Sequence, residues 1–275
     1  MTKKEFIVDR NINLNKAIRV NLPFLSNYQI EKILEKKDIK VNGKRIKDFC
    51  ELNVGDLVEI YYDVKTEPWY EEVYLDDNVL IVNKKCGIEV ISEEDRDLTS
   101  ILKQDYKEVY PVHRIDRNTE GLVIFAKNKQ TEDELLKAFK DRTITKKYLL
   151  EVKGRVNVDA IKSRLFLKKL SSVSKVIIAE VKTSGYEEIK TIFKFIRYDG
   201  ENTLLEAELI TGKTHQIRAH ISYYGHSIVG DGKYGKGDGK LHLTSYFIKF
   251  KLKDNSFLSY LNEKHFEIMP TWISN

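Results

Sequence analysis

The spacing of apolar residues changes from helical to strand-like in the first part of the chain. Between residues 14 and 25 the apolar positions follow the helical period, and Ser26 can cap a second helix over residues 27–36. Residues 39–44 then predict a strand that enters an Asn-Gly turn, and residues 57–60 predict another strand. The pattern indicates a small domain of two helices followed by short strands.

Farther along the chain the pattern is mainly that of strands. Apolar and polar residues alternate cleanly over residues 205–209, and the pair Asp199-Gly200 is typical of a hairpin turn, which indicates antiparallel pairing. We expect strands at residues 79–84, 122–126, 148–152, 191–195, 204–210 and 247–252, and helices at residues 131–140 and 214–224. The elements predict an α+β fold, in which a mixed, largely antiparallel sheet forms the larger domain and a small α/β domain precedes it.

A break in the pattern separates the two domains. Residues 63–73 contain Pro68 and several acids and show no clear period, so we interpret them as a linker. The small domain then spans residues 10–62, and the large domain spans residues 74–275.

The composition is that of a folded and basic protein. Of the 275 residues, 41% are hydrophobic and 32% are charged, and the net charge of +5 permits binding to a polyanion without requiring it. Cys50 and Cys86 have no metal-ligand or disulfide spacing, and we find neither a signal sequence nor an apolar run of bilayer length. We therefore expect a cytoplasmic protein that does not bind membranes.

One acid is distinguished by its neighbours. Asp116 lies between Arg114 and Arg117, in a polar loop that precedes the apolar residues 122–126. Neighbouring cations favour the ionised form of an acid, so this carboxylate suits chemistry at the start of a strand. Acids that only form salt bridges are also common in loops, and the local pattern alone leaves both interpretations open.

The same loop carries the first of several motifs. Residues 111–128, PVHRIDRNTEGLVIFAKN, contain a segment that resembles HRLDRxTSGL, the catalytic motif of the RluA-type family of RNA pseudouridine synthases. The segment differs at Ile115 and at Glu120, where Ser is usual. Three further segments resemble the family in order along the chain: residues 76–87, in which Lys85-Cys86 replaces Pro-Ala; Lys146-Lys147-Tyr148, similar to a KxY segment; and residues 209–220, similar to LxTGRxHQIRxH and followed by Gly230-Asp231 and Tyr234-Gly235.

The resemblance implies a pseudouridine synthase fold, a reaction and a set of site residues. It assigns Asp116 as the catalytic carboxylate and places Tyr148 and Arg218 beside it, the Tyr ring to stack on uracil and the Arg to pair with the acid. It implies no cofactor, because the isomerisation imports no group and passes no electrons to another molecule. Other residues of these motifs are expected to bind the substrate: His113, Arg114, Arg117, Thr119, Lys147, His215 and Gln216.

The small N-terminal domain resembles the S4 RNA-binding fold. The similarity rests on Leu22-Pro23, Ser26, residues 39–44 and Gly55-Asp56, whereas Asn27 stands where that fold usually has Arg. Basic side chains commonly contact RNA phosphates, and the lysines expected to do so are Lys32, Lys36, Lys37, Lys40 and Lys44. The alternative is a structural domain with a solvated lysine face.

Together these observations predict a monomeric enzyme that converts uridines to pseudouridines in ribosomal RNA, with the large-subunit RNA as first choice, or in transfer RNA. The alternatives are a catalytically silent RNA-binding protein of the same fold and a hydrolase of another glycoside. The first conflicts with the complete set of Asp116, Tyr148 and Arg218, and the second lacks the second carboxylate that such hydrolases need. No recognised metal-binding spacing is present, so we expect no metal site.

Overall fold

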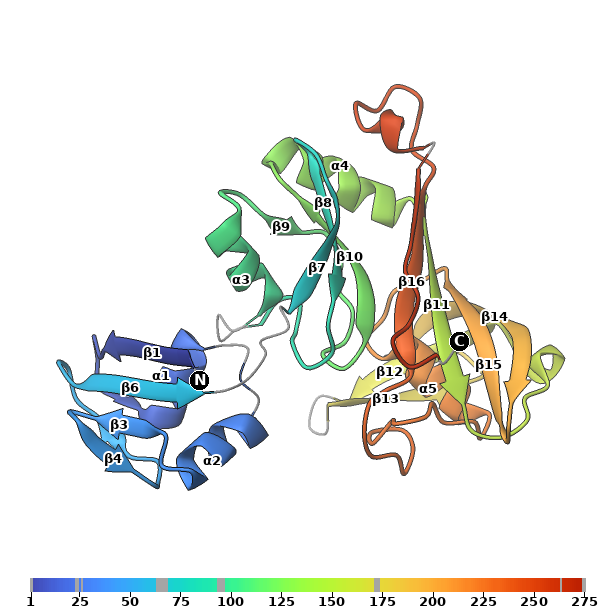
Figure 1. Ribbon diagram of the computed structural model, residues 1–275. Coiled ribbons are helices and arrows are strands. Elements are labelled where there is room, and N and C mark those ends of the chain that lie inside the picture. The colour runs from blue at the N-terminus through green and yellow to red at the C-terminus, as the bar shows by residue number, and fades with distance from the viewer. Residues whose placement is uncertain are drawn as a thin grey trace. The chain divides into compact units, whose positions relative to one another are not determined.

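The computed structural model divides into two compact units, Met1–Trp69 and Tyr70–Asn275 (Figure 1). It describes residues 2–22, 25, 27–62, 69–92, 97–170, 174–262 and 264–273, with the backbone alone at residues 27–29 and 32. Pro23, Ser26, residues 63–68 of the predicted linker, and the side chains of Asn27 and Lys32 therefore lie outside the described residues. No helix in the described ranges is both long enough and apolar enough to cross a membrane.

The N-terminal unit contains the two helices and the short strands that the pattern predicts. Its elements are β1 (Thr2–Ile7), β2 (Ile12–Asn13), α1 (Leu14–Asn21), α2 (Asn27–Glu35), β3 (Ile39–Val41), β4 (Lys44–Ile46), β5 (Glu51–Leu52) and β6 (Leu57–Tyr62). The strands form one sheet in the order β1-β6-β3-β4 and a separate pair, β2-β5. The predicted turn at Asn42-Gly43 joins β3 to β4, and φ is positive at both residues, as this hairpin turn requires.

The N-terminal unit has a core of its own. Leu14 and Ile18 of α1 are buried together with Ile30 of α2 and Ile60 of β6. Strand β1 adds to the sheet by pairing with β6, and the pattern did not predict it, because three of its six residues are charged and five are exposed. An edge strand accepts such residues, since only one of its edges is paired.

The C-terminal unit is built on one long sheet, with strands in the order β13-β12-β14-β15-β11-β16-β10-β8-β7; β17 pairs with β16 and β9 with β10. The described pairs are antiparallel except β10 with β16, which confirms the predicted α+β class with a mixed, largely antiparallel sheet. The elements are β7 (Tyr70–Leu75), β8 (Val79–Lys84), α3 (Leu98–Asp105), β9 (Tyr110–Pro111), β10 (Glu120–Ala126), α4 (Lys129–Lys140), β11 (Ile144–Val152), η1 (Val158–Ala160), β12 (Arg164–Leu170), β13 (Lys175–Ala179), β14 (Glu187–Asp199), β15 (Asn202–Leu209), α5 (Gln216–Tyr223), β16 (Leu243–Phe250), η3 (Ser259–Leu261) and β17 (His265–Glu267).

Each predicted strand of this unit is present, and the predicted hairpin at Asp199-Gly200 joins β14 to β15. The two predicted helices are also present, but each begins at a different residue from the one predicted. Helix α4 starts two residues earlier than predicted, and the Asn128 side chain caps it by accepting the backbone N–H of Thr131. Helix α5 starts at Gln216, two residues later than predicted, because His215 has a left-handed backbone with φ of 53°.

Residues 70–73, expected in the linker, instead belong to β7. This strand pairs antiparallel with β8, with a bulge between Glu72 and Tyr74. The prediction was wrong there because the bulge breaks the alternation, and because an edge strand can carry exposed acids such as Glu71 and Glu72.

Strand β10 is buried along its whole length. It lies between β8 and β16 in the sheet, and α4 packs on it (Figure 1), so that Leu135 of α4 joins Ile124 of β10 and Ile248 of β16 in one core. The loop of residues 112–119, which leads into β10, therefore ends on a rigid support.

Gly121, where β10 meets β16, cannot accept a side chain. Its φ is 120°, and an added Cβ would lie 2.3 Å from the carbonyl oxygen of Ser245. We expect Gly121→Ala to lower the free energy of unfolding by about 3 kcal/mol, through backbone strain and overpacking, as measured by chemical denaturation.

Gly200→Ala is the matched control. Gly200 also has a positive φ, of 58°, but open space surrounds the position of its Cβ. The control should lose only about 1 kcal/mol. Equal losses in the two variants would show that the contact between Gly121 and Ser245 does not matter.

Candidate active site

A buried lysine supports the loop that carries Asp116. Lys84, the last residue of β8, is fully buried, and burial lowers its pKa to about 7. Its ammonium donates hydrogen bonds to the carbonyl oxygens of Lys85, Ile88 and Arg117 at 2.9, 2.8 and 3.1 Å. Lys84 thus ties the end of β8 to the residue that follows Asp116.

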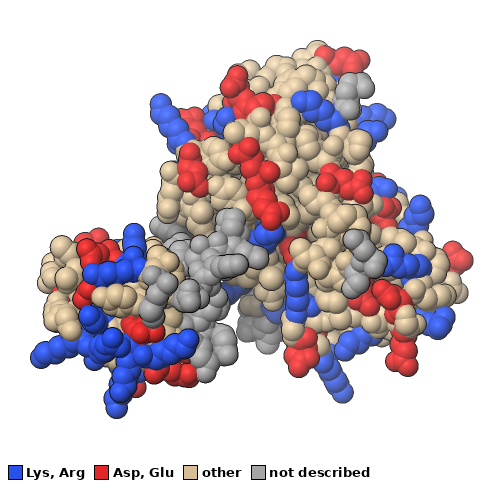
Figure 2. All heavy atoms as spheres, in the orientation of Figure 1, with Lys and Arg blue, Asp and Glu red and all other residues tan. Residues whose placement is uncertain are grey.

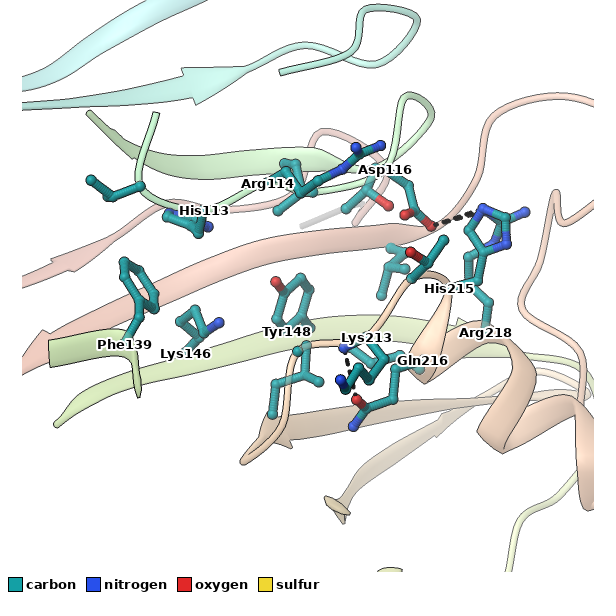
Figure 3. Close-up of a pocket in the computed structure, with 18 of the residues that line it drawn as sticks. His113, Arg114, Asp116, Phe139, Lys146, Tyr148, Lys213, His215, Gln216 and Arg218 are labelled. Carbon is teal, nitrogen blue, oxygen red and sulfur yellow. Dashed lines mark hydrogen bonds and ion pairs between the residues drawn. The ribbon is translucent and has the colours of Figure 1, made fainter. Parts of the chain in front are cut away.

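A cavity of 410 Å³ opens beside this loop (Figure 3). Its walls come from the loop of residues 112–119, from the end of α4, from the first half of β11, from the start of α5 with the segment before it, and from Leu243 of β16. Among the described lining residues, five are Lys or Arg and one, Asp116, is an acid. The polar and aromatic lining residues are His113, Arg114, Asp116, Thr119, Phe139, Lys140, Lys146, Tyr148, Lys213, Thr214, His215, Gln216 and Arg218.

Two carboxylates and one guanidinium form a chain of ion pairs at one end of the cavity. Arg218 Nη1 donates to Asp116 Oδ2 at 3.0 Å, while Arg218 Nε and Nη2 donate to the two carboxylate oxygens of Asp231 at 2.8 and 2.9 Å. Asp231 is buried and also accepts the backbone N–H groups of Lys233 and Tyr234. Asp231 therefore fixes the guanidinium, which presents its remaining nitrogen, Nη1, to Asp116.

Arg218 and Asp231 stabilise each other's charged forms. Burial alone lowers the pKa of the Arg218 guanidinium, but the hydrogen bonds and charge of Asp231, together with the charge of Asp116, raise it overall. Burial alone raises the pKa of Asp231, but its hydrogen bonds and ion pair with Arg218 lower it overall. Both groups thus stay ionised at neutral pH.

Tyr148 of β11 lies in the cavity next to the loop of Asp116 (Figure 3). Its side chain is 5% exposed, and burial raises the pKa of its phenol, an effect that the nearby charge of Asp116 reinforces. The hydroxyl therefore keeps its proton at neutral pH, so Tyr148 can offer a ring face and a hydrogen-bond donor.

His215, just before α5, faces Asp116 with its ring. Its Nδ1 lies 2.9 Å from the hydroxyl of Tyr234, and its Nε2 lies 3.9 Å from Asp116 Oδ2. The Tyr234 hydroxyl accepts the backbone N–H of Val176, which leaves its own proton to donate to Nδ1. Burial lowers the pKa of His215, so we assign a neutral ring with its proton on Nε2, toward Asp116.

Residues 78–223 match the family described as RNA pseudouridylate synthase. The chain belongs to this family. The "Uncharacterized RNA pseudouridine synthase" of Mycoplasma capricolum subsp. capricolum is 32% identical, over 100% of this chain and 99% of that protein. The "Ribosomal large subunit pseudouridine synthase C" of Vibrio parahaemolyticus is 31% identical, over 88% of this chain and 85% of that one.

A solved structure shares the fold. "Human RNA Pseudouridylate Synthase Domain Containing 1" has a TM-score of 0.55 and 22% identity, over 74% of this chain and 91% of that chain. The predicted RluA-type family and enzyme class are confirmed, and the protein is an RNA pseudouridine synthase, which isomerises uridine to pseudouridine.

The structure brings the three predicted catalytic residues of this synthase together. Asp116 comes from the loop before β10, Tyr148 from β11 and Arg218 from α5, and all three line the same cavity. Each of these segments carries one of the motifs that the sequence shows. Their proximity comes from the sheet, in which β16 alone separates β10 from β11.

Most of the predicted substrate-binding residues lie at this cavity or beside it. His113, Arg114, Thr119 and His215 line it, with Arg114 exposed and Thr119 buried. Arg117 is exposed and lines a neighbouring groove of 510 Å³, which shares Arg114 and Asp116 with the cavity and adds Lys175 and Lys233.

The amide of Gln216 is fully engaged by protein groups. It accepts hydrogen bonds from the Thr211 hydroxyl and the backbone N–H of Lys213, and it donates to the Lys190 carbonyl and the Thr191 hydroxyl. All four of its hydrogen-bonding positions are used, so the structure favours a role in holding α5 against β14 rather than the predicted binding of substrate.

The structure argues against the expectation that Lys147 binds substrate. Lys147 pairs with Glu206 at 3.0 Å and is not among the residues that line the cavity, whereas Lys146 is. Successive side chains of a strand point to opposite faces, so Lys146 and Tyr148 lie on one face of β11 and Lys147 lies on the other. The motif indicates a lysine at the site, but only the register of β11 decides which of the two lysines lines the cavity.

Sequence reasoning gave no role to four further groups at the site. Asp231 and Tyr234 fall in a motif that the sequence shows, but only the fold reveals that they hold Arg218 and His215. Lys84 and Lys146 also stand in segments that resemble the family, but a strand lysine is normally a surface residue, so the sequence offers no reason to expect either side chain at the site. Within the described residues, no group of three or more His, Cys, Asp or Glu is placed to hold a metal ion.

The lysines predicted to contact RNA lie on the N-terminal unit. Lys36, Lys37 and Lys44 are exposed, and Lys40 is half-buried with its Nζ 5.2 Å from the ring centroid of Tyr61. Figure 2 shows Lys and Arg side chains gathered on the part of this unit that carries α2, β3 and β4. The side chain of Lys32 lies outside the described residues.

Loss of the Asp231 charge should misplace Arg218. In Asp231→Asn the amide nitrogen cannot accept a hydrogen bond, so the guanidinium loses one of its two fixed acceptors. We expect the single-turnover rate of pseudouridine formation at saturating RNA to fall about a hundredfold, as for a small misplacement of a catalytic group, with RNA affinity little changed.

Asp238→Asn is the control for this variant, because Asp238 is an exposed acid of the same loop region. It should keep the wild-type rate. A weakened RNA affinity with an unchanged rate in Asp231→Asn would mean that Asp231 acts outside the chemical step.

Proposed function

We propose that this synthase modifies uridines of large-subunit ribosomal RNA, with Asp116 as the catalytic carboxylate and Tyr148 and Arg218 beside it. The observation that carries the proposal is the 3.0 Å ion pair between Asp116 and Arg218, next to Tyr148, in a cavity with no other acid among its described lining residues. The name of the Vibrio relative supports this choice of RNA. Transfer RNA is the alternative that the test below distinguishes.

The reaction breaks the bond between C1′ and N1 of uridine, turns the base, and joins C1′ to C5 with loss of the C5 proton. Asp116 can begin it by attacking C1′ or by removing the C2′ proton, and either route needs an accessible carboxylate oxygen. Arg218 binds Oδ2 of Asp116, and no described residue forms a hydrogen bond with Oδ1. In the proposed complex Oδ1 faces the sugar.

Two further side chains position the target nucleotide in this scheme. The ring of Tyr148 supplies a stacking surface for uracil, a contact worth about 1–3 kcal/mol. Arg114 is exposed at the cavity, where it can occupy the space that the flipped nucleotide leaves in the RNA. Flipping costs a few kcal/mol, so a side chain that takes over this space favours the reactive complex.

The charges around the site support an RNA substrate. The cavity and the neighbouring groove meet at Asp116, and the groove adds Arg117, Lys175 and Lys233 to the basic residues of the cavity. A run of cations on both sides of the reacting nucleotide suits the phosphates that flank it. The exposed lysines of the N-terminal unit would extend this contact to RNA farther from the target.

We also infer that the synthase works as a monomer in the cytoplasm. Its two cysteines, Cys50 and Cys86, are unpaired, as is usual in a reducing compartment. Asp116, Tyr148 and Arg218 line one cavity together, so the proposed reaction calls for no residue of a second copy.

Asp116→Asn tests the catalytic assignment. The change keeps the size of the side chain and removes its charge, so we expect pseudouridine formation to fall by about a thousandfold or more, while RNA affinity and thermal stability stay near wild type. Asp159→Asn, at an exposed acid of η1, is the control and should keep full activity. Turnover within tenfold of wild type would refute the role of Asp116.

The same pair of variants identifies the RNA. Pseudouridines are mapped in ribosomal and transfer RNA from a strain that lacks the gene and that carries either the wild-type copy or the Asp116→Asn copy. We expect one or more uridines of large-subunit ribosomal RNA to be modified only with the wild-type copy. Sites confined to transfer RNA would overturn the choice of ribosomal RNA but would leave the chemistry intact.

Removal of residues 1–69 tests the proposed RNA-binding role of the N-terminal unit. The remaining chain contains the whole long sheet and every residue proposed for the reaction. We expect a folded enzyme with weaker RNA affinity and a shallower dependence of that affinity on salt, since lysine–phosphate contacts are lost. The rate at saturating RNA should change little. An unchanged affinity and salt slope would restore the alternative of a solvated lysine face.

A further inference from the structure

Lys146 is a cation without a described counterion in the wall of the cavity. Its Nζ lies 4.9 Å from the centroid of the Phe139 ring, and no described residue gives it an ion pair or a hydrogen bond. Burial lowers its pKa to about 8, with no neighbouring acid to offset the effect. Its neighbour Lys147, in contrast, pairs with Glu206 on the other face of β11.

A half-buried ammonium without a counterion is costly, because the group has lost part of its hydration and has gained only the attraction of an aromatic ring. His113, which also lines the cavity, adds no positive charge, because burial and the charge of Lys146 lower the pKa of its imidazole well below its usual range. Such an uncompensated cation beside a cavity is typical of a place where a ligand brings or develops negative charge.

Lys146 and Asp116 lie on two sides of Tyr148 (Figure 3). Lys146 and Tyr148 are two residues apart on one strand and point to the same face. A uridine with its C1′ at Asp116 and its base against the ring of Tyr148 therefore extends the carbonyl edge of the base toward Lys146. The sugar and the base thus meet different charged groups, an acid at one end and a cation at the other.

The first step of the reaction creates negative charge on the base. When the bond between C1′ and N1 breaks, its electron pair stays on N1, and the resulting uracil anion spreads the charge onto O2 and O4. The sugar either forms an ester with Asp116 or loses its C2′ proton to that carboxylate. On both routes one negative charge leaves Asp116 and one appears on uracil, so the step is balanced.

We propose that Lys146 is a catalytic residue that stabilises the departing uracil anion. This inference rests on the proposed role of Asp116 and adds a group for the other half of the same bond cleavage. Because the charge on uracil appears only as the bond breaks, Lys146 stabilises the transition state more than the bound uridine.

The test compares Lys146→Met with Lys147→Met on two RNAs. Methionine keeps an apolar stem against Phe139 and removes the charge, and Lys147 is the neighbouring lysine that faces away from the cavity. The RNAs are identical short substrates that carry either uridine or 5-fluorouridine at the position found by mapping. Fluorine withdraws electrons and stabilises the uracil anion by itself, so it partly replaces a stabilising cation.

Single-turnover consumption of the target nucleotide is measured at saturating RNA. We expect Lys146→Met to slow uridine consumption about a hundredfold, the loss typical of one removed charge-stabilising donor. The same variant should slow 5-fluorouridine consumption only about tenfold, since a better leaving group depends less on the cation. Lys147→Met should stay within about twofold of wild type on both RNAs, as expected for a group outside the transition state.

Equal slowing of both RNAs by Lys146→Met would overturn the proposal and would indicate that Lys146 contacts an RNA phosphate instead. A wild-type rate in Lys146→Met would also overturn it. If thermal denaturation shows that Lys146→Met does not fold, Lys146→Gln is measured against the same expectations. A wild-type enzyme that converts no uridine would instead refute the proposed function.

Discussion

The bidentate pair between Arg218 and Asp231 is the contact on which the rest of the site depends. A buried guanidinium loses several kcal/mol of hydration, which only a well-placed anion offsets, and Asp231 provides both a charge and two acceptors. Backbone N–H groups of residues 233 and 234 hold this carboxylate in turn. Asp231 therefore holds the Arg218 guanidinium in place, and the guanidinium in turn positions Asp116.

The sheet brings the remaining groups to this anchor. β10 and β11 lie on the two sides of β16, which sets the loop of Asp116 opposite the face of β11 that carries Lys146 and Tyr148. Lys84 holds the loop through the Arg117 carbonyl, and the fully buried β10 prevents it from shifting. Helix α5 starts late because His215 adopts a left-handed backbone, which turns its ring toward Asp116. Each of these supports is a backbone or core feature, so the site is preorganised by the fold.

Charge at the site comes from lysines and arginines rather than from histidines. Burial lowers the pKa of both His113 and His215, which leaves these rings neutral near pH 7. The described lining of the cavity and the neighbouring groove is therefore mainly positive, with Asp116 and Glu89 as its acids. Such a lining suits an RNA substrate, whose phosphates surround the single nucleotide on which the acid acts.

The sequence by itself determined the fold class, the two-part organisation and the segments that hold the site, because alternating apolar residues and ordered motifs are local features of the chain. It also indicated Asp116, Tyr148 and Arg218, since each stands in a motif. It could not show that the linker region ends in a bulged edge strand, or that Lys146 rather than Lys147 lines the cavity. It also could not show that the Gln216 amide forms its hydrogen bonds with protein groups. Nor could it pair Arg218 with Asp231, or show that Lys84 lies buried under the catalytic loop. These outcomes depend on strand register, on burial and on contacts between distant residues, and only the tertiary structure decides them.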